Sequence, residues 1–220
     1  DPELTKQVNL SASLDLFAAA RNARVERFIF ASTCSNYGRM SDPTDYVNEE
    51  SELSPVSLYA ETKVAVESAL LDTPKGGDIS STVLRFATVF GISPRMRFDL
   101  TVNEFTRDLL TNQKLMVFGQ QFWRPYVHVS DVARAIVTVI SAPIESVESE
   151  VFNVGNRDQN YTKGDLVELI RSNISAATEI EHVHKDEDPR DYRVSFDKIQ
   201  NQLGYSTTRI VEDGIREIID

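Results

Sequence analysis

A tyrosine and a lysine, Tyr59 and Lys63, stand four residues apart in the chain. On a helix this spacing places the phenol and the ammonium on the same face. A fixed positive charge close to a phenol favours the phenolate and lowers the pKa of the phenol from about 10. Such a phenol can accept the proton of an alcohol while a hydride leaves the carbon, or return it. The spacing is also common in unrelated surface pairs, so a second signal is needed.

A cluster of hydroxyl side chains follows the apolar run Arg27–Ser32. This run has the composition of a strand that is buried on both faces. Ser32 ends it, and Thr33 and Ser35 come directly afterwards. Hydroxyls at the carboxyl end of a parallel strand lie where α/β sheets bind their ligands. Taken alone, the cluster is also typical of a turn.

The elements that must position these side chains follow from the apolar periodicity. Helices are predicted over Glu3–Ala23, Leu58–Leu71, Leu100–Thr111, Asp131–Ile140, Thr162–Asn173, Phe196–Leu203 and Ile210–Ile219. Strands are predicted over Arg27–Ser32, Ser81–Phe90, Lys114–Phe118, Pro125–Val129, Glu150–Val154 and Ile180–Val183. Gly204 stands where a helix end favours glycine. The alternation predicts an α/β architecture with a mostly parallel sheet.

The composition limits the class of protein. The 220 residues include 23 Lys and Arg against 34 Asp and Glu, so the net charge is −11. With no basic run, this charge disfavours nucleic acid as a partner. The single cysteine, Cys34, cannot form an internal disulfide and fits a reducing compartment, so a cytoplasmic location is expected. No apolar stretch approaches the roughly 20 residues of a membrane span, so no membrane partner is expected.

The order of the motifs is more specific than any one of them. The chain has a strand, the Ser/Thr cluster, Tyr37-Gly38, a proline-containing loop and then Tyr-x-x-x-Lys. This order resembles the extended short-chain dehydrogenase/reductase family, in its NAD-dependent epimerase/dehydratase branch, which acts on nucleotide sugars. The segments 84–91, 124–133 and 152–155 resemble further motifs of that branch. The resemblance covers essentially the whole chain.

The resemblance implies a partial Rossmann-type, doubly wound parallel sheet with a smaller C-terminal α/β part. Residues 1–91 would form the C-terminal half of the dinucleotide-binding domain and carry the catalytic residues. Residues 92–220 would bind mainly the nucleotide sugar, with some segments returning to the first domain. The nine glycines do not form the family's glycine-rich pyrophosphate loop. We therefore expect a chain that lacks the N-terminal strands, with the choice between NAD and NADP open.

The resemblance also implies roles for the first motifs. Tyr59 would be the acid/base, and Lys63 would tune it and contact the nicotinamide ribose of NAD. Thr33 lies four residues before Tyr37, where the family has the Ser or Thr that holds the substrate hydroxyl. The implied cofactor contacts are Asn9, Ser32, Tyr59, Lys63 and Ala87.

A second set of residues would bind the nucleotide sugar. Its members are Thr33, Thr88, Arg124, Tyr126, Lys185, Asp188 and two alternative phosphate ligands, Arg95 and Arg190. Arg124 suits a diphosphate because its guanidinium donates two parallel hydrogen bonds. Thr88 stands where 4-epimerases often have a sugar-contacting Asn. Lys185 and Asp188 match a C-terminal basic and acidic pair only roughly.

Two departures from the family pattern favour one reaction over others. The family's 4,6-dehydratases have Asp-Glu after the catalytic Thr, whereas this chain has Cys34 and Ser35. Elimination of water needs an additional acid and base, which a hydroxyl and an ordinary thiol do not supply. Decarboxylating relatives commonly have Glu at the position of Ser35. Cys34 is interpreted as a packing residue, with a catalytic thiol as the alternative.

Epimerisation of a nucleotide sugar through a transient 4-keto intermediate is the function that these residues predict. Two alternatives remain open: an NAD(P)H-dependent ketosugar reductase, and a truncated, non-catalytic nucleotide-sugar-binding module. No metal site is expected. Relatives are often dimers, and the helices over 3–23 and 58–71 would form the interface of a homodimer.

Overall fold

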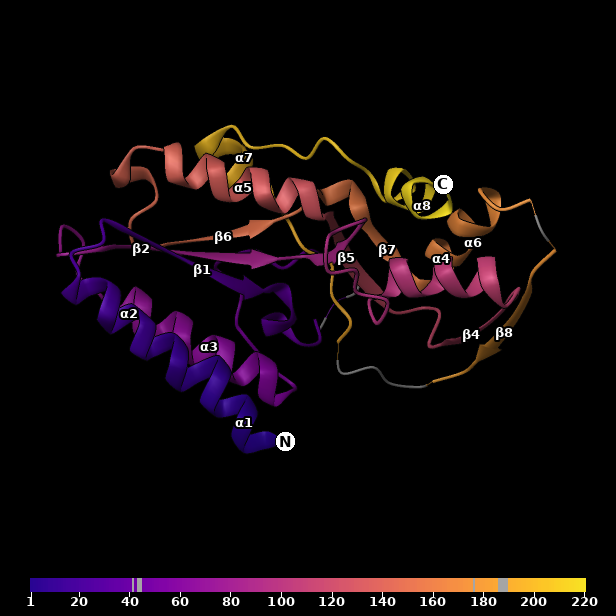
Figure 1. The fold of residues 1–220 in the computed structure, drawn as a ribbon, viewed down its shortest axis with the longest axis horizontal. Helices are drawn as coiled ribbons and strands as arrows, with labels where there is room; N and C mark the ends of the chain where they lie inside the picture. Colours follow the sequence, from indigo (N-terminus) through magenta and orange to yellow (C-terminus); the bar gives the residue numbers. More distant parts are fainter. Residues whose placement is uncertain (41, 43–44, 176, 186–189) are drawn as a thin grey trace.

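The sheet that carries the Ser/Thr cluster has three parallel strands in the computed structural model, which describes residues 1–40, 42, 45–175, 177–185 and 190–220 (Figure 1). Their order is β1 (Arg27–Thr33), β2 (Ser80–Phe86) and β6 (Glu150–Val154). Residues 80–85 of β2 are all buried, because helices cover both faces of the sheet. Burial along the whole strand is typical of a parallel sheet, although only Val83 and Leu84 of these six residues are apolar. The predicted α/β, Rossmann-like fold with a parallel sheet is confirmed.

Two layers of helices enclose this sheet (Figure 1). One layer contains α1 (Pro2–Lys6), α2 (Ala12–Asn22) and α3 (Leu58–Leu71); the other contains α5 (Val129–Ser141) and α7 (Asp197–Leu203). The predicted N-terminal helix is interrupted by a π-helical segment, η1 (Gln7–Ser11), which periodicity does not reveal. The α3 helix has the predicted bounds, and Ser57 caps its first turn by accepting the Ala60 N–H at 3.2 Å.

A second, mixed sheet corrects one predicted strand. It consists of β3 (Thr88–Phe90), β5 (Trp123–His128) and β7 (Asn160–Thr162), with β3 parallel and β7 antiparallel to β5. The predicted strand Ser81–Phe90 is two strands, since the chain leaves the first sheet at Ala87, whose N–H donates to Val154 O at 3.0 Å. The apolar pattern continues through the bend and so concealed it. The short β7 was not predicted.

The remaining elements surround the second sheet. They are α4 (Thr101–Thr111), β4 (Lys114–Phe118), α6 (Lys163–Ser172), β8 (Glu179–Val183) and α8 (Val211–Ile219), with the 3₁₀ turn η4 (Arg157–Gln159) before β7. Two further 3₁₀ turns belong to the first sheet: η2 (Cys34–Tyr37) follows β1, and η3 (Ile144–Ser146) precedes β6. The β4 and β8 strands pair in parallel, in agreement with the predicted strands. Thr162 and Asp165 form a capping box at the start of α6. Gly204 ends α7 at φ 65°, as predicted.

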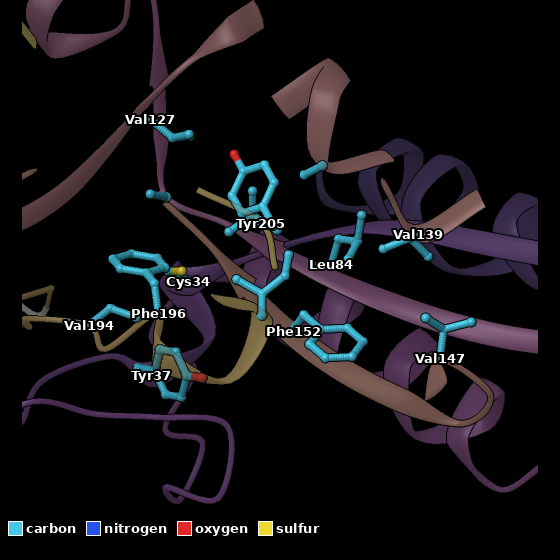
Figure 2. Close-up of a cluster of buried hydrophobic side chains, with 14 of the residues drawn as sticks. Cys34, Tyr37, Leu84, Val127, Val139, Val147, Phe152, Val194, Phe196 and Tyr205 are labelled. Carbon is cyan, nitrogen blue, oxygen red and sulfur yellow. The ribbon is translucent and has the colours of Figure 1, made fainter. Parts of the chain in front are cut away.

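The apolar core has three clusters. The largest joins both sheets and includes Cys34, Leu84 and Phe152 (Figure 2). A second cluster packs α4, α6 and α8 around the second sheet, and a third packs α3 against β1 and β2. The segment Thr33–Cys34 at the end of β1 therefore lies where the two sheets meet.

Two kinds of feature are absent from the described residues. No helix among them combines the length and the apolar character needed to cross a membrane. No group of three or more His, Cys, Asp or Glu side chains within the same part of the chain is arranged to hold a metal ion.

Candidate active site

Thr33 and Tyr59 come together at the carboxyl end of β1. Thr33 is the last residue of β1 and caps η2, and its Oγ1 accepts the Ser35 N–H at 3.1 Å. Tyr59 lies in the first turn of α3, and the Thr33 side chain lies close enough to its phenol to lower the pKa of that phenol. Because Thr33 Oγ1 accepts from the Ser35 backbone, its own proton remains available to a ligand or to Tyr59.

Lys63 lies on the same side of α3 as Tyr59. Its Nζ donates to Ala31 O at 2.9 Å and lies 4.5 Å from the centre of the Phe30 ring and 5.9 Å from that of the Tyr59 ring. The predicted shared face is therefore present. The hydrogen bond to Ala31 uses one of the three donors of the ammonium.

The pKa of Tyr59 differs from the sequence prediction. Burial raises the pKa of the phenol above its ordinary value, while the hydrogen bond with Thr33 and the positive charge of Arg97 oppose the shift. The prediction that Lys63 lowers the pKa of Tyr59 was wrong for this structure, because the Lys63 ammonium donates its hydrogen bond to the Ala31 carbonyl. Burial lowers the pKa of Lys63, and the carboxylate of Glu67 opposes that shift.

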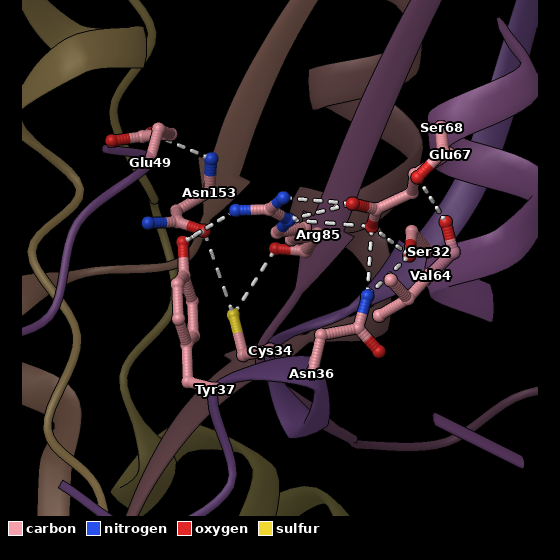
Figure 3. A network of polar contacts seen from close by, with 10 residues as sticks. All are labelled: Ser32, Cys34, Asn36, Tyr37, Glu49, Val64, Glu67, Ser68, Arg85 and Asn153. Carbon is pink, nitrogen blue, oxygen red and sulfur yellow. Dashed lines mark hydrogen bonds and ion pairs between the residues drawn. The ribbon is translucent and has the colours of Figure 1, made fainter. Parts of the chain in front are cut away.

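A buried ion pair joins α3, the helix of Tyr59 and Lys63, to β2 (Figure 3). Arg85 of β2 donates to both carboxylate oxygens of Glu67, with Nη2 at 2.7 Å from Oε2, and the side chains are only 5% and 2% exposed. Arg85 Nη1 also donates to Tyr37 OH at 3.0 Å. Tyr37 OH in turn donates to Asn153 Oδ1 of β6 at 2.8 Å. The network joins α3, η2 and two strands.

The two departures next to Thr33 have different surroundings. Cys34 is buried, donates to Arg85 O at 3.2 Å, and has a thiol pKa that burial raises. A thiol in such surroundings is a poor nucleophile, which agrees with the interpretation of Cys34 as a packing residue. Ser35, in contrast, lines a cavity.

This cavity has a volume of about 490 Å³ and contains several predicted substrate residues. Ser35, Thr88, Arg124, Arg190 and Tyr192 line it, together with Asp99, Leu100, Thr101, Glu104, Phe105, Asp108, Lys114, Leu115, Met116, Phe118 and Lys163. Arg124 is nearly buried, with its guanidinium 5.5 Å from the centre of the Tyr192 ring. The cavity thus combines cations, carboxylates and apolar side chains.

Other predicted substrate residues lie elsewhere. Tyr126 is fully buried in the second apolar cluster, and burial raises its pKa to about 12, so the structure corrects its predicted contact with substrate. Arg95 is exposed in the loop after β3 and does not line this cavity. Lys185 Nζ lies 5.3 Å from the centre of the ring of Phe118, a lining residue. Asp188 lies outside the described residues.

The predicted cofactor contacts are also divided. Ser32 is buried and its Oγ donates to Glu67 Oε1, so this hydroxyl is used inside the protein. Ala87 has a buried side chain at the bend between the sheets. Both side chains face the core, and the contact of these two residues with a cofactor stays a prediction. Asn9 is half-buried in η1, which packs against α3.

Sequence reasoning missed four residues of this region. Glu67 and Arg85 form the buried ion pair. The positive charge of Arg97 acts to lower the pKa of Tyr59. Tyr192 lies against the guanidinium of Arg124. Glu67 stands four residues after Lys63, so the periodicity that joined Tyr59 to Lys63 would have placed it on the same face. The other three come from distant segments and carry no local signal.

Comparison with known sequences places this site in a family. The description "NAD dependent epimerase/dehydratase family" belongs to the family profile that matches residues 1–155. The chain belongs to this family. The predicted family resemblance is thereby confirmed, and the predicted NAD dependence is confirmed at the level of the family.

Two relatives illustrate the range of the epimerase/dehydratase family that matches this chain. A protein of Bacillus subtilis (strain 168) described as an uncharacterized UDP-glucose epimerase, YtcB, is 32% identical over 152 residues, which are 69% of this chain and 46% of that protein. A UDP-glucose 4-epimerase of Rhizobium leguminosarum bv. trifolii is 27% identical over the whole chain and 71% of its own length. The matched part of the Bacillus protein is thus about half of it.

Solved structures of family members have the same fold. The UDP-glucose 4-epimerase of Thermus thermophilus, in complex with NAD, superposes with a TM-score of 0.84 at 25% identity over 100% of this chain and 71% of that one. MoeE5, in complex with UDP-glucuronic acid and NAD, has a TM-score of 0.83 at 26% identity, covering 95% and 69%. UDP-glucose and UDP-glucuronic acid, which the two descriptions name, both carry a diphosphate and a six-carbon sugar.

Proposed function

We propose that this protein epimerises a nucleotide sugar at C4 through a transient 4-keto intermediate, with NAD as cofactor. The observation that supports the proposal is the proximity of Thr33 and Tyr59 at the carboxyl end of β1, with Lys63 Nζ 5.9 Å from the centre of the Tyr59 ring. Ser35, whose N–H donates to Thr33, links this pair to the cavity that contains Arg124.

The residues around the pair fit the nicotinamide end of NAD. Lys63 presents an ammonium beside Tyr59 at the carboxyl end of β1, where α/β sheets bind nucleotides. Lys63 and Tyr59 would hold the ribose, and Asn9 remains a candidate contact from η1. When bound, NAD supplies the acceptor and the donor of the hydride.

Tyr59 acts as the acid and base in this proposal. Thr33 holds the sugar hydroxyl by a hydrogen bond, and the Tyr59 oxygen takes the proton from that hydroxyl as C4 is oxidised. The same phenol returns the proton to the keto oxygen when C4 is reduced on its opposite face. Arg97 favours the phenolate by its positive charge, and the ammonium of Lys63 adds to this when it turns toward the phenol.

Cations of the cavity would hold the diphosphate. Arg124 and Arg190 approach the cavity from β5 and from the C-terminal segment, and guanidinium groups bind phosphate oxygens with two hydrogen bonds. Thr88, at the start of β3, would contact the sugar, and Lys185 would add charge near Phe118. The substrate would then extend from Thr33 to the arginines.

Epimerisation is favoured over dehydration by the surroundings of Thr33. Water elimination needs a second acid/base pair near the sugar, and the two residues that follow Thr33 are a buried thiol and a serine. Epimerisation needs only one proton acceptor and donor, which Tyr59 supplies.

The test is an assay of the full-length protein with NAD and UDP-glucose or UDP-glucuronic acid. We expect the C4 epimer to form with no net change in NADH. Stoichiometric consumption of NAD(P)H with a ketosugar would instead identify a reductase. Binding of the sugar nucleotide without turnover by any of these routes would identify a non-catalytic binding module.

We also propose that the full-length protein is a homodimer. The N-terminal helical run exposes Leu4, Val8 and Leu16, with Leu16 62% exposed. These helices lie beside α3 on the outer side of the sheet (Figure 1). A second copy packed on α1, α2 and α3 would remove the three apolar side chains from water.

A further inference from the structure

Glu67 is the most completely hydrogen-bonded carboxylate around the site, and the proposed reaction does not use it. Its Oε2 accepts from Arg85 Nε at 3.1 Å and from Nη2 at 2.7 Å. Its Oε1 accepts from Ser32 Oγ and from Asn36 Nδ2, the latter at 2.8 Å (Figure 3). Because each of these donors comes from a different position in the fold, the carboxylate joins β1, β2 and η2 to α3.

The two donors to Oε1 lie on either side of Thr33. Ser32 immediately precedes Thr33, and Asn36 follows it by three residues, within η2. Asn36 Nδ2 also donates to Ser32 Oγ at 3.2 Å, which closes a triangle of side chains under the loop. The backbone of Thr33 is therefore fixed at both ends by one carboxylate.

The same carboxylate belongs to the helix of the catalytic pair. Tyr59, Lys63 and Glu67 follow one another at intervals of four residues and share a face of α3. Movement of Thr33 relative to Tyr59 thus requires Glu67 to lose a hydrogen bond that is buried from water.

Asn36 is an unfavourable choice for packing alone. Its side chain is fully buried, and Oδ1 has no hydrogen-bond partner in the described part of the chain. An unsatisfied buried oxygen costs stability, whereas an aliphatic residue of similar size would avoid that cost. The amide is explained by the hydrogen bonds that its Nδ2 donates to Glu67 Oε1 and Ser32 Oγ.

We propose that Glu67, held by Arg85, is a positioning residue that sets the distance between Thr33 and Tyr59 through Ser32 and Asn36. The role rests on the proposed function, since it serves the acid/base pair. An error of about 1 Å in such a pair can lower a rate by about 100-fold.

The test uses Asn36→Leu and Glu67→Gln in the full-length protein with NAD. Asn36→Leu removes the link to Thr33 and leaves the ion pair with Arg85 in place, so it remains informative if Glu67→Gln does not fold. We expect crystal structures of these variants to show Thr33 displaced relative to Tyr59. With a sugar nucleotide that the wild type converts, kcat should fall by about 10–100-fold while KM changes by less than about twofold.

Val66→Ala is the matched control. Val66 is buried next to Glu67 but packs in the apolar cluster of α3, away from Thr33. It should lower Tm while kcat and the position of Thr33 relative to Tyr59 stay unchanged. An unmoved Thr33 in Asn36→Leu, or a kcat equal to that of wild type, would overturn the inference. A wild type that converts no sugar nucleotide would contradict the proposed function, whereas the crystallographic result would still decide the role of Glu67.

Discussion

Tyr59 is a phenol whose reactivity depends on opposing influences. Burial favours the neutral phenol, and the hydrogen bond with Thr33 and the charge of Arg97 favour the phenolate. Since the raised pKa leaves Tyr59 protonated near neutral pH, the added charge of a bound cofactor and of Lys63 has to assist ionisation. The proposed acid/base role can be tested separately from this tuning.

Tyr59→Phe should abolish turnover and leave sugar-nucleotide affinity nearly unchanged, because only the ionisable oxygen is lost. Turnover assays and calorimetric titration measure the two effects. Tyr161→Phe is the control, since its hydroxyl faces Gln159 at 3.5 Å and lies outside the cavity. Turnover that survives in Tyr59→Phe would exclude the acid/base role.

Arg97→Ala should move the acid limb of the kcat–pH profile to higher pH. Arg97 lowers the pKa of Tyr59, so loss of this cation makes the phenolate harder to form, and a higher pH is needed to reach the same rate. Arg171→Ala, on α6 and paired with Glu168 at 3.1 Å, should leave the limb in place. A shift to lower pH in Arg97→Ala would contradict the assignment.

Arg124→Ala should weaken sugar-nucleotide binding by about 1.5–3 kcal/mol, the range of a hydrogen bond to a charged group. Isothermal titration with UDP-glucose or UDP measures the change. Unaltered affinity would remove Arg124 from the proposed diphosphate site.

At the scale of elements, two glycines allow the backbone to pack closely against aromatic rings of the second sheet. Gly91 at the end of β3 has φ 99°, and a Cβ there would lie 2.2 Å from the His128 ring. A Cβ on Gly214 of α8 would lie 2.5 Å from the Phe90 ring. His128 also bridges β5 and α8 through Nε2, which is 2.8 Å from Glu217 Oε2.

Gly214→Ala should therefore destabilise the protein by about 1–3 kcal/mol, because the added methyl overpacks the contact between α8 and β3. Gly164→Ala is the matched control, since a Cβ at this helical position makes only ordinary contacts, the nearest at 3.4 Å. It should stabilise the protein by about 0.5–1 kcal/mol through helix propensity. Urea unfolding measures both variants, and equal effects would contradict the steric argument.

At the scale of the whole molecule, both helix layers expose apolar side chains, on different elements. The layer of α1 and α2 exposes Leu4, Val8 and Leu16, whereas α5 on the opposite layer exposes Val137 and Ile140. The proposed dimer uses only the first layer.

Leu16→Asp should convert the dimer to a monomer, because a carboxylate in an apolar interface loses its hydration without gaining a partner. Light scattering after size exclusion measures the mass of the full-length protein. Val137→Asp is the control, since Val137 is 60% exposed on the other layer. If this variant dissociates the dimer and Leu16→Asp does not, the interface is on the opposite side.

Individual elements show which structural features the sequence predicts correctly. The α3 helix has the predicted bounds because its signals are local: the cap at Ser57 and the apolar periodicity. The prediction of one strand over Ser81–Phe90 was wrong, because the chain bends at Ala87 and its two halves join different sheets. Tyr126 failed for a similar reason, since a motif match does not tell which side of a strand faces the core.

The amino-acid order alone determined the alternation of helices and strands, the spacing of Tyr59 and Lys63, and the family. These depend on contacts within a few residues or on motifs that stay recognisable in isolation. Folding decided that Glu67 and Arg85 pair, that Arg97 influences Tyr59, and that the Lys63 ammonium turns to Ala31. Each of these outcomes depends on burial and on charges brought together from distant segments, and neither quantity exists before the chain is folded.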